Sequence, residues 1–169
     1  EMDKIVDICK RYNLHLFEDC AQAHFAEWKG KKVGTFGVAG TFSFFPGKNL
    51  GAYGDAGAII TDDDDIANNM RKLKDFGRTG GGNDIHHTIG YNFKFNDILA
   101  ALAVVQLKRL SERLEKAKLD YILYYNGLRE ISEIEFFKTN FSAGNVPLWV
   151  DIKLKKNREH FIEFMQNKN

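Results

Sequence analysis

The chain has 169 residues, of which 44% are hydrophobic and 28% are charged, and these are ordinary values for a globular protein. Its 24 basic and 23 acidic side chains leave a formal net charge of +1, too small for a broad field that attracts nucleic acid or lipid. No apolar run reaches the roughly 18 residues that suggest a membrane span, and no signal-peptide pattern is found. Composition therefore favours a globular domain, or part of a larger one, and argues against membrane and nucleic-acid partners.

Two cysteines, Cys9 and Cys20, lie on an expected helix and near an expected strand end. Their spacing is typical of neither a zinc site nor a disulfide framework. The simplest interpretation is a pair of buried free thiols in a reducing cytoplasm, so we expect a cytoplasmic protein. The chain opens on Glu1 inside one helical pattern and closes inside another, so we also expect further sequence beyond both ends.

The first part of the chain alternates helical and strand patterns. Apolar residues at helical spacing predict a helix over 2–12, and LHLFED at 14–19 follows as a short strand. The segment 21–37 is expected to be irregular, with turns. Two apolar runs bounded by glycine, GTFSFF at 40–45 and GAIIT at 57–61, predict buried strands. This alternation indicates an α/β fold.

The segment 61–76 predicts a second helix, with Thr61 as its N-cap. Acids in its first turn and bases in its last turn complement the helix dipole. The acidic run 62–65 could suggest a metal site, but it lacks the oxygen-ligand spacing of a calcium loop. The dipole explains these charges better, and we expect no metal.

A glycine-rich polar segment at 77–96 predicts a long mobile loop of the kind that often carries function. A long helical region is expected to follow, from about residue 96 to residue 128. Beyond it, a strand is predicted at 146–154 and a helix at 157–168.

We divide the chain into two parts on this pattern. Residues 1–128 are interpreted as part of a large domain together with the long helical region. Residues 129–169 are interpreted as the beginning of a smaller C-terminal domain.

One lysine, Lys48, stands in the glycine-rich bend between the two predicted strands. It could bind phosphate, remain a solvated loop residue, or act as a covalent catalyst. A phosphate-binding P-loop would need glycine at the position of Phe42 and Ser or Thr at the position of Asn49, so that motif is absent. GTFGVAG at 34–40 is not a dinucleotide fingerprint, and no Gly-x-Ser-x-Gly elbow is present.

An acid and a lysine remain as a candidate pair. Asp19 ends a predicted strand, and ligands of open α/β sheets lie at the carboxyl ends of strands. A lysine that forms a Schiff base with pyridoxal phosphate needs a protonated ring nitrogen and a held phosphate. Asp19 could supply the acid, and Ser43, five residues before Lys48, could supply a hydroxyl. Capping by Asp19 and ordinary strand hydrogen bonding by Ser43 are the structural alternatives.

The linked motifs add a resemblance. FEDCAQAHFAEWKGKKVGTFGVAGTFSFFPGKNLGAYGDAGAIITDD at 17–63, followed by IGYNFKFNDILAALAVVQLKRL at 89–110, resembles the sugar aminotransferases of the DegT/DnrJ/EryC1/StrS family. The resemblance implies an α/β PLP-dependent transferase fold of type I. This chain would hold a large-domain portion with a central, mostly parallel sheet in three layers, plus the start of the small C-terminal domain.

The resemblance also implies a role for each matching residue. Asp19 is similar to the acid that pairs with the pyridine nitrogen of pyridoxal 5'-phosphate, and Gln22 to the residue beside the ring. Ser43 is similar to a phosphate ligand, and Lys48 to the Schiff-base lysine that also moves the proton. Asn92 is similar to an asparagine that reaches the cofactor phosphate of a neighbouring subunit, which implies a homodimer with shared active sites.

The implied reaction is transfer of an amino group, expected to come from glutamate, to a nucleotide-linked keto-sugar in amino-sugar biosynthesis. PGKNLGAYGDAG at 46–57 is closer to the branch that aminates sugar carbon 3, so a dTDP-3-keto-6-deoxyhexose is expected. The alternatives are amination at carbon 4, a UDP-linked sugar, or a non-catalytic relative that binds a sugar nucleotide. Relatives that dehydrate sugars carry histidine in place of the lysine, so Lys48 argues against that reaction.

Three further residues stand out, one of them as a departure from the family pattern. Phe25 occupies a position where the family usually has glycine. His86 and His87, in the polar loop, could bind sugar phosphates or act in catalysis, or could simply be exposed.

Overall fold

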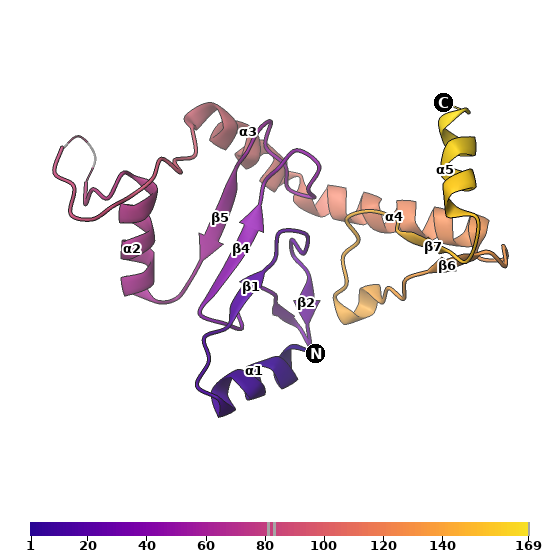
Figure 1. Ribbon diagram of the computed structural model, residues 1–169, viewed down its shortest axis with the longest axis horizontal. Coiled ribbons are helices and arrows are strands. Elements are labelled where there is room, and N and C mark those ends of the chain that lie inside the picture. The colour runs from indigo at the N-terminus through magenta and orange to yellow at the C-terminus, as the bar shows by residue number, and fades with distance from the viewer. Residues whose placement is uncertain (81, 83, 169) are drawn as a thin grey trace.

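The structure is a computed structural model that describes residues 1–80, 82 and 84–168. In Figure 1 a small sheet occupies the middle, α2 lies at one end, and α4 extends to the other end, where β6, β7 and α5 gather. The elements in chain order are α1 (Met2–Arg11), β1 (Phe17–Asp19), β2 (Glu27–Trp28), β3 (Lys31–Lys32), β4 (Ala39–Ser43), β5 (Gly57–Ile60), α2 (Asp64–Lys74), α3 (Asp97–Lys108), α4 (Leu110–Leu128), β6 (Ile134–Phe136), a 3-10 helix (Phe141–Ala143), β7 (Ile152–Leu154) and α5 (Arg158–Gln166).

The central sheet has the strand order β1-β4-β5. Strand β1 pairs parallel to β4, with Asp19 opposite Thr41, and β5 pairs antiparallel to β4, with Gly57 opposite Ser43. The parallel pair brings the carboxyl ends of β1 and β4 to the same edge of the sheet. Helices and strands alternate as predicted, and the α/β class is confirmed.

The carboxylate of Glu18 fastens β1 to the loop that leads into β4. Glu18 is 6% exposed, and its two oxygens accept three backbone hydrogen bonds, from Gly34 at 2.7 Å, Phe36 at 2.6 Å and Gly37 at 2.8 Å. Hydrogen bonds to a buried charged group are among the stronger ones in proteins. They fix the path of the chain between the two parallel strands.

A second cluster of buried side chains lies beyond the end of β4. Leu50, Leu110 and Leu114 form it, and Phe44 and Val146 pack against it. The cluster joins the segment after Lys48 to helix α4 and to the segment that leads into β7. Burial of large aliphatic side chains supplies about 1.5–3 kcal/mol each, so this cluster stabilises the approach of segments distant in sequence.

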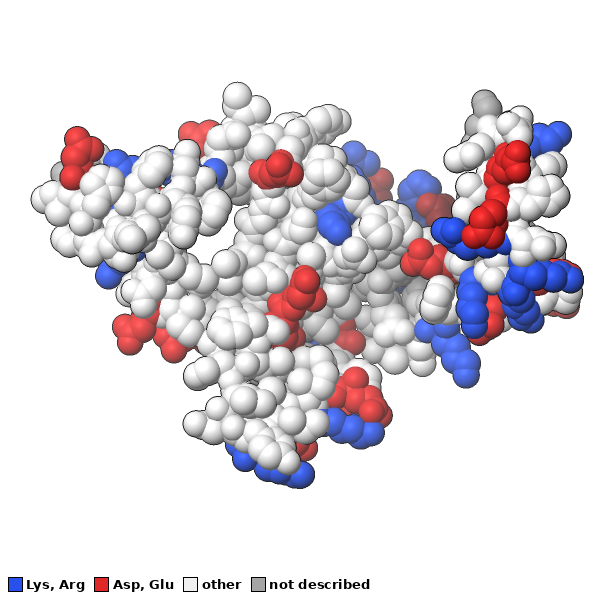
Figure 2. Space-filling model, in the orientation of Figure 1, with Lys and Arg blue, Asp and Glu red and all other residues white. Residues whose placement is uncertain are grey.

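Charged and uncharged surfaces are separated along the molecule. Figure 2 shows basic and acidic side chains interspersed around β6, β7 and α5, while the face over the sheet and α3 is largely uncharged. Strand β5 and helix α3 also carry exposed apolar side chains, including Ile59 at 52% and Ile98 at 77%. No helix in the described residues is long and apolar enough to cross a membrane.

The expected capping residue of the second helix is corrected by the structure. Helix α2 begins at Asp64, and its N-cap is Asp63, whose Oδ1 accepts a hydrogen bond from the backbone of Ile66 at 2.9 Å. The hydroxyl of Thr61, two residues before this cap, donates to the carbonyl of Val38 at 2.7 Å and accepts from the backbone of Asp63 at 3.1 Å. Thr61 therefore belongs to the end of the sheet rather than to the helix.

The predicted long helix after residue 96 is two helices. Helix α3 ends at Lys108 and α4 starts at Leu110, and Arg109 between them has φ of −98° and ψ of 3°, outside the α-helical region. Asn96 caps α3 by accepting from the backbone of Leu99 at 3.0 Å.

Two predictions of irregular or extended structure also need correction. The segment 21–37 contains a short hairpin of β2 and β3, and the strand expected at 146–154 is limited to Ile152–Leu154. Its partner, β6, was not predicted. Aromatic packing stabilises this region: the Tyr121 ring lies 6.0 Å from Phe136 and 5.4 Å from Phe141.

An isolated bridge between Asn92 and Asp75, the C-cap of α2, connects the polar segment 77–96 to that helix, and a second bridge joins Arg78 and His86 within the segment. Residues 81 and 83 lie outside the described residues, and the mobility of the segment stays a prediction.

Both thiols are free, with Cys20 buried and Cys9 half-buried. Burial, and then the charges of Glu18 and Asp19, raise the pKa of Cys20 to about 11. Among the described residues no group of three or more His, Cys, Asp and Glu side chains is placed to hold a metal ion.

The Glu18 anchor gives a stability prediction. Replacing Glu18 with Gln removes the charge and one acceptor, so at least one buried N–H loses its partner, at a cost of about 2–3 kcal/mol in the free energy of unfolding. Urea unfolding followed by circular dichroism measures the change. Glu135→Gln is the matched control, because its salt bridge to Lys153 is exposed and contributes about 0.5 kcal/mol or less. Equal stability of the two variants would contradict the anchor.

Phe25 gives a second prediction, because its φ of 63° lies in the left-handed region that disfavours residues with a Cβ. A β-branched residue fits this conformation worst, so Phe25→Ile should lower the free energy of unfolding by about 1–2 kcal/mol. Phe25→Gly should stay within about 0.5 kcal/mol, since relief of strain offsets the flexibility that glycine adds to the unfolded chain. Thermal unfolding compares the two, and indistinguishable midpoints for Ile and Gly would overturn this interpretation.

Candidate active site

Lys48 lies in a tight turn just beyond the end of β4. Its backbone N–H donates to the carbonyl of Phe45 at 2.9 Å, and its side chain is half-buried. The turn needs glycine at Gly51, because a Cβ there would lie 2.7 Å from the carbonyl oxygen of Pro46. The bend that surrounds the lysine in the sequence is therefore a close return of the backbone that holds Lys48 at the edge of the sheet.

Asp19 and Ser43 lie on the same face of the sheet. Asp19 is paired with Thr41 in the parallel ladder, and Ser43 is two residues further along β4. Side chains two residues apart on a strand share a face, and two residues span about 7 Å. The carboxylate, the hydroxyl and the turn that carries Lys48 are thus gathered at the carboxyl edge of two parallel strands.

Each of these two groups already makes one local hydrogen bond. Oδ1 of Asp19 accepts from the backbone of Ala21 at 3.0 Å, and Oγ of Ser43 accepts from the backbone of Phe45 at 3.3 Å. The Ser43 contact is the ordinary local one that its structural alternative predicts, whereas Asp19 closes a turn and caps no helix, because turns follow it. Because a carboxylate has two oxygens and a hydroxyl also donates, both groups keep capacity for a ligand.

A cleft of about 350 Å³ opens beside this edge. Gln22 and Trp149 both line it, and Nζ of Lys48 lies 5.6 Å from the centroid of the Trp149 ring. The described lining residues are Gln22, Ala23, Ala26, Tyr121, Thr139, Asn145, Val146, Pro147, Leu148, Trp149 and Asp151. Gln22 therefore lines the cleft, and Lys48, which is not among the described lining residues, approaches it through Trp149, in a wall contributed by the C-terminal part of the chain.

The wall is attached directly to the lysine turn. Asn49 is 8% exposed, and its Nδ2 donates to the carbonyl of Pro147 at 3.2 Å. The neighbouring Leu50 packs with Val146 in the buried cluster. Nothing in the local sequence pattern singles out Asn49 or Trp149, because the two segments are about one hundred residues apart.

His24 is a further residue of the site that the sequence did not assign. It is 2% exposed, and neither ring nitrogen has a well-aligned hydrogen-bond partner in the described part of the chain. Its ring lies 5.7 Å from that of Phe42 and 6.1 Å from that of Phe44. Burial lowers the pKa of His24, and the charge of Lys48 acts in the same direction, while the backbone of Ser43 partly offsets both. A neutral imidazole therefore lies beneath the lysine turn.

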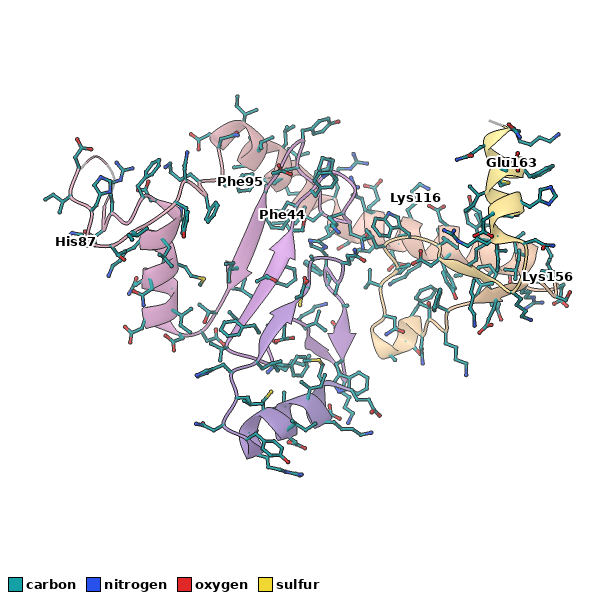
Figure 3. The ribbon with its side chains drawn as sticks, in the orientation of Figure 1. Phe44, His87, Phe95, Lys116, Lys156 and Glu163 are labelled. Carbon is teal, nitrogen blue, oxygen red and sulfur yellow. The ribbon has the colours of Figure 1, made fainter. Side chains whose placement is uncertain are left out.

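Other candidates lie away from the cleft. Asn92 is exposed and paired with Asp75, and it is not among the described lining residues; its expected role in a neighbouring subunit stays a prediction. His87 is exposed in the loop beyond α2, and Figure 3 places it at the opposite side of the sheet from α4, far from Phe44. His86 is bonded through Nδ1 to the carbonyl of Phe76 at 2.7 Å.

The donor set fits pyridoxal phosphate. An amine, a carboxylate and a hydroxyl converge on one sheet edge, and the amide of Gln22 lines the adjoining cleft. An amine can bond to the aldehyde carbon, a carboxylate can pair with a ring nitrogen, and a hydroxyl can donate to a phosphate.

Comparison with curated proteins gives relatives along most of the chain. The pleiotropic regulatory protein of Geobacillus stearothermophilus is 41% identical over 130 residues, which cover 77% of this chain and 34% of that protein. The dTDP-3-amino-3,4,6-trideoxy-alpha-D-glucose transaminase of Streptomyces venezuelae is 37% identical over 110 residues, covering 65% and 28%. The GDP-perosamine synthase of Vibrio cholerae is 32% identical over 171 residues, covering 99% and 46%.

Solved structures share the fold. A DegT DnrJ EryC1 StrS aminotransferase from Brucella abortus superposes with a TM-score of 0.86 at 28% identity, covering 99% of this chain and 44% of that one. NtdA from Bacillus subtilis, solved with bound cofactor PMP, gives 0.80 at 27% identity, covering 98% and 37%. These neighbours confirm the expected fold, and pyridoxal phosphate is the cofactor of enzymes of this kind.

The chain spans less than half the length of each of these relatives, between 28% and 46% of the curated ones. The family model for the DegT/DnrJ/EryC1/StrS aminotransferase family matches residues 1–169. The match covers the lysine turn, the sheet edge and the cleft wall together. The chain therefore belongs to the DegT/DnrJ/EryC1/StrS aminotransferase family.

Proposed function

We propose that this chain carries the catalytic lysine and the cofactor-binding edge of a pyridoxal-phosphate-dependent sugar aminotransferase. The observation that carries the proposal is the position of Lys48. A half-buried lysine on a turn fixed by Gly51 lies 5.6 Å from the ring of Trp149, which lines the cleft, and follows the sheet edge that carries an acid and a hydroxyl. A solvated loop lysine would need neither the cleft nor the tight turn.

The residues at the edge would hold the cofactor by complementary chemistry. Asp19 would pair with the pyridine nitrogen, Gln22 would lie beside the ring, and Ser43 would donate to the phosphate. Asn92 would reach the phosphate in the neighbouring subunit of a homodimer. Pyridoxal phosphate, when bound, supplies an aldehyde carbon that bonds to amines and a ring that withdraws electrons from that carbon.

Lys48 has two tasks in this proposal. Its Nζ is the nucleophile that bonds to the cofactor, and after its release it is the acid and base that moves one proton. The tight turn limits the movement of its backbone, so the amine returns to the same position after each transfer. The buried, neutral His24 beneath the turn adds no second charge near the ammonium group.

The proposed substrates are glutamate as amino donor and a dTDP-linked 3-keto-6-deoxyhexose as acceptor, used in amino-sugar biosynthesis in the cytoplasm. The name of the Streptomyces venezuelae relative supports a dTDP-linked sugar. A GDP-linked sugar is a second candidate, favoured by the Vibrio cholerae relative, which matches 99% of the chain.

A non-catalytic relative is the rival from another class. The Geobacillus stearothermophilus protein, at 41% identity, bears a regulatory name rather than an enzymatic one. Retention of Lys48 together with Asp19 favours the enzyme.

A trapping experiment tests the lysine. Incubation with pyridoxal phosphate, reduction with borohydride and peptide mapping should place a covalent adduct on Lys48, and Lys48→Ala should lose it. Transfer of the amino group from glutamate should fall by at least about 10³-fold, because nucleophile and proton carrier are lost together. Lys31→Ala, which replaces an exposed lysine of the hairpin, is the matched control and should keep both the adduct on Lys48 and the transfer rate. An adduct that persists in Lys48→Ala would sink the assignment.

A second variant separates the charge of Asp19 from its turn-forming hydrogen bond. Asn at position 19 can still accept from the backbone of Ala21, so Asp19→Asn should leave the free energy of unfolding within about 0.5 kcal/mol of its value. It cannot hold a proton on the pyridine nitrogen, so the rate of amine transfer should fall by about 10²-fold or more while the adduct on Lys48 still forms.

The same variant distinguishes a capping residue from a catalytic one. Asp63→Asn, which replaces the N-cap of helix α2 outside the cleft, serves as the matched control and should keep the transfer rate. Unchanged transfer in Asp19→Asn would mean that Asp19 only forms the turn.

A further inference from the structure

We propose that Trp149 determines substrate specificity by stacking its indole on the sugar ring of the nucleotide-linked substrate. The inference rests on the proposed function, because it assigns the sugar to the cleft beside Lys48. It adds a recognition residue from the C-terminal part of the chain, outside the motifs at 17–63 and 89–110.

The first observation is the exposure of the indole. Trp149 is 55% exposed while it lines a cleft, so a large aromatic face is presented to the cleft and is not consumed in the core. The ammonium group of Lys48 lies over that face at 5.6 Å from the ring centroid. The negative face of an aromatic ring attracts cations and polarised C–H groups. When Nζ of Lys48 is bonded to the cofactor, the indole face is available to another partner.

The second observation is that the distances allow both contacts at once. A group stacked on the indole lies about 4.5 Å from its centroid, and reacting atoms lie about 3–3.5 Å apart. The sum of these two lengths, about 8 Å, exceeds the 5.6 Å between Nζ and the centroid. A ring can therefore rest on Trp149 and present one carbon to Lys48. The nucleobase, separated from that carbon by the diphosphate, would lie farther from the lysine.

The third observation is the chemistry of the lining. Among its described residues the cleft has no lysine or arginine, and Thr139, Asn145 and Asp151 supply neutral groups and a carboxylate. A carboxylate accepts hydrogen bonds from hydroxyl groups and repels phosphate. This part of the cleft suits an uncharged, hydroxyl-bearing ring better than a diphosphate.

The wall is held in place before a substrate arrives. Asn49 donates to the carbonyl of Pro147, two residues before Trp149, and the hydroxyl of Tyr121 donates to the carbonyl of Phe137 at 2.9 Å. Val146 packs in the buried cluster with Leu50. A preorganised aromatic surface binds a ring with less loss of side-chain entropy.

The test uses dTDP-glucose as a stable sugar nucleotide and dTDP as the matched ligand without sugar. Calorimetric titration of the full chain should give a dissociation constant for dTDP-glucose that rises about tenfold in Trp149→Ala and less in Trp149→Phe, which keeps an aromatic face. Binding of dTDP should not change between the variants. Trp28→Phe, which alters the other tryptophan, is the matched control and should bind like the unaltered chain.

Fluorescence gives an independent readout. In Trp28→Phe, Trp149 is the sole tryptophan of the chain, and its emission should change on addition of dTDP-glucose but not of dTDP. Equal changes with both ligands would show base stacking and overturn the proposal, as would no change with dTDP-glucose or equal affinities of Trp149→Ala and the unaltered chain.

Borohydride trapping on Lys48 separates this proposal from the proposed function. An adduct on Lys48 with no Trp149 effect overturns the stacking and leaves the aminotransferase. A Trp149 response without any adduct supports the stacking in a protein that binds a sugar nucleotide without transferring an amine.

Discussion

The parallel pairing of β1 with β4 is the constraint on which the rest of the site depends. It sets Asp19 opposite Thr41 and thereby puts the carboxylate on the face that Ser43 shares. The pairing is itself maintained by Glu18, whose buried carboxylate satisfies three backbone N–H groups of the connecting loop. A parallel pair requires a long connection, and a charged group that binds this connection keeps the register from slipping.

Beyond the sheet edge, the site is assembled from segments that are distant in sequence. The lysine turn follows β4 directly, whereas the opposite wall of the cleft comes from residues 139–151. One buried hydrogen bond from Asn49 and one hydrophobic cluster around Leu110 connect them. The distance between Lys48 and Trp149 is therefore set by tertiary packing. Substitutions in the buried cluster around Leu110 should change the position of the lysine.

The sequence predicted the elements whose structure is determined by interactions between residues close together in the chain. Helical spacing predicted α1, glycine-bounded apolar runs predicted β4 and β5, and the linked motifs predicted the fold. The predicted cap of α2 was wrong because the helix begins two residues later, and Thr61 makes a tertiary hydrogen bond to Val38 at the end of the sheet, which no local pattern records. Strand β6 likewise depends on packing, in particular on the contact of Phe136 with Tyr121, and the break at Arg109 directly precedes Leu110 of the buried cluster.

The candidate site likewise contains residues that the sequence predicts and residues that only the structure identifies. Lys48, Asp19 and Ser43 could be proposed from the sequence because strand ends and glycine turns are local features. Trp149, Asn49 and His24 could not, since their significance lies in contacts across 18 to about 100 residues.

Phe25 shows that a residue type and the backbone conformation at its position can disagree. The family usually has glycine at this position, and the structure gives Phe25 a left-handed backbone with φ of 63°, one residue after the buried His24. The residue is 48% exposed, so core packing does not explain the aromatic side chain. This strained turn directly follows His24, whose ring packs against Phe42 and Phe44. Phe25 thus holds a backbone conformation that glycine would adopt at lower cost, in the turn that carries His24.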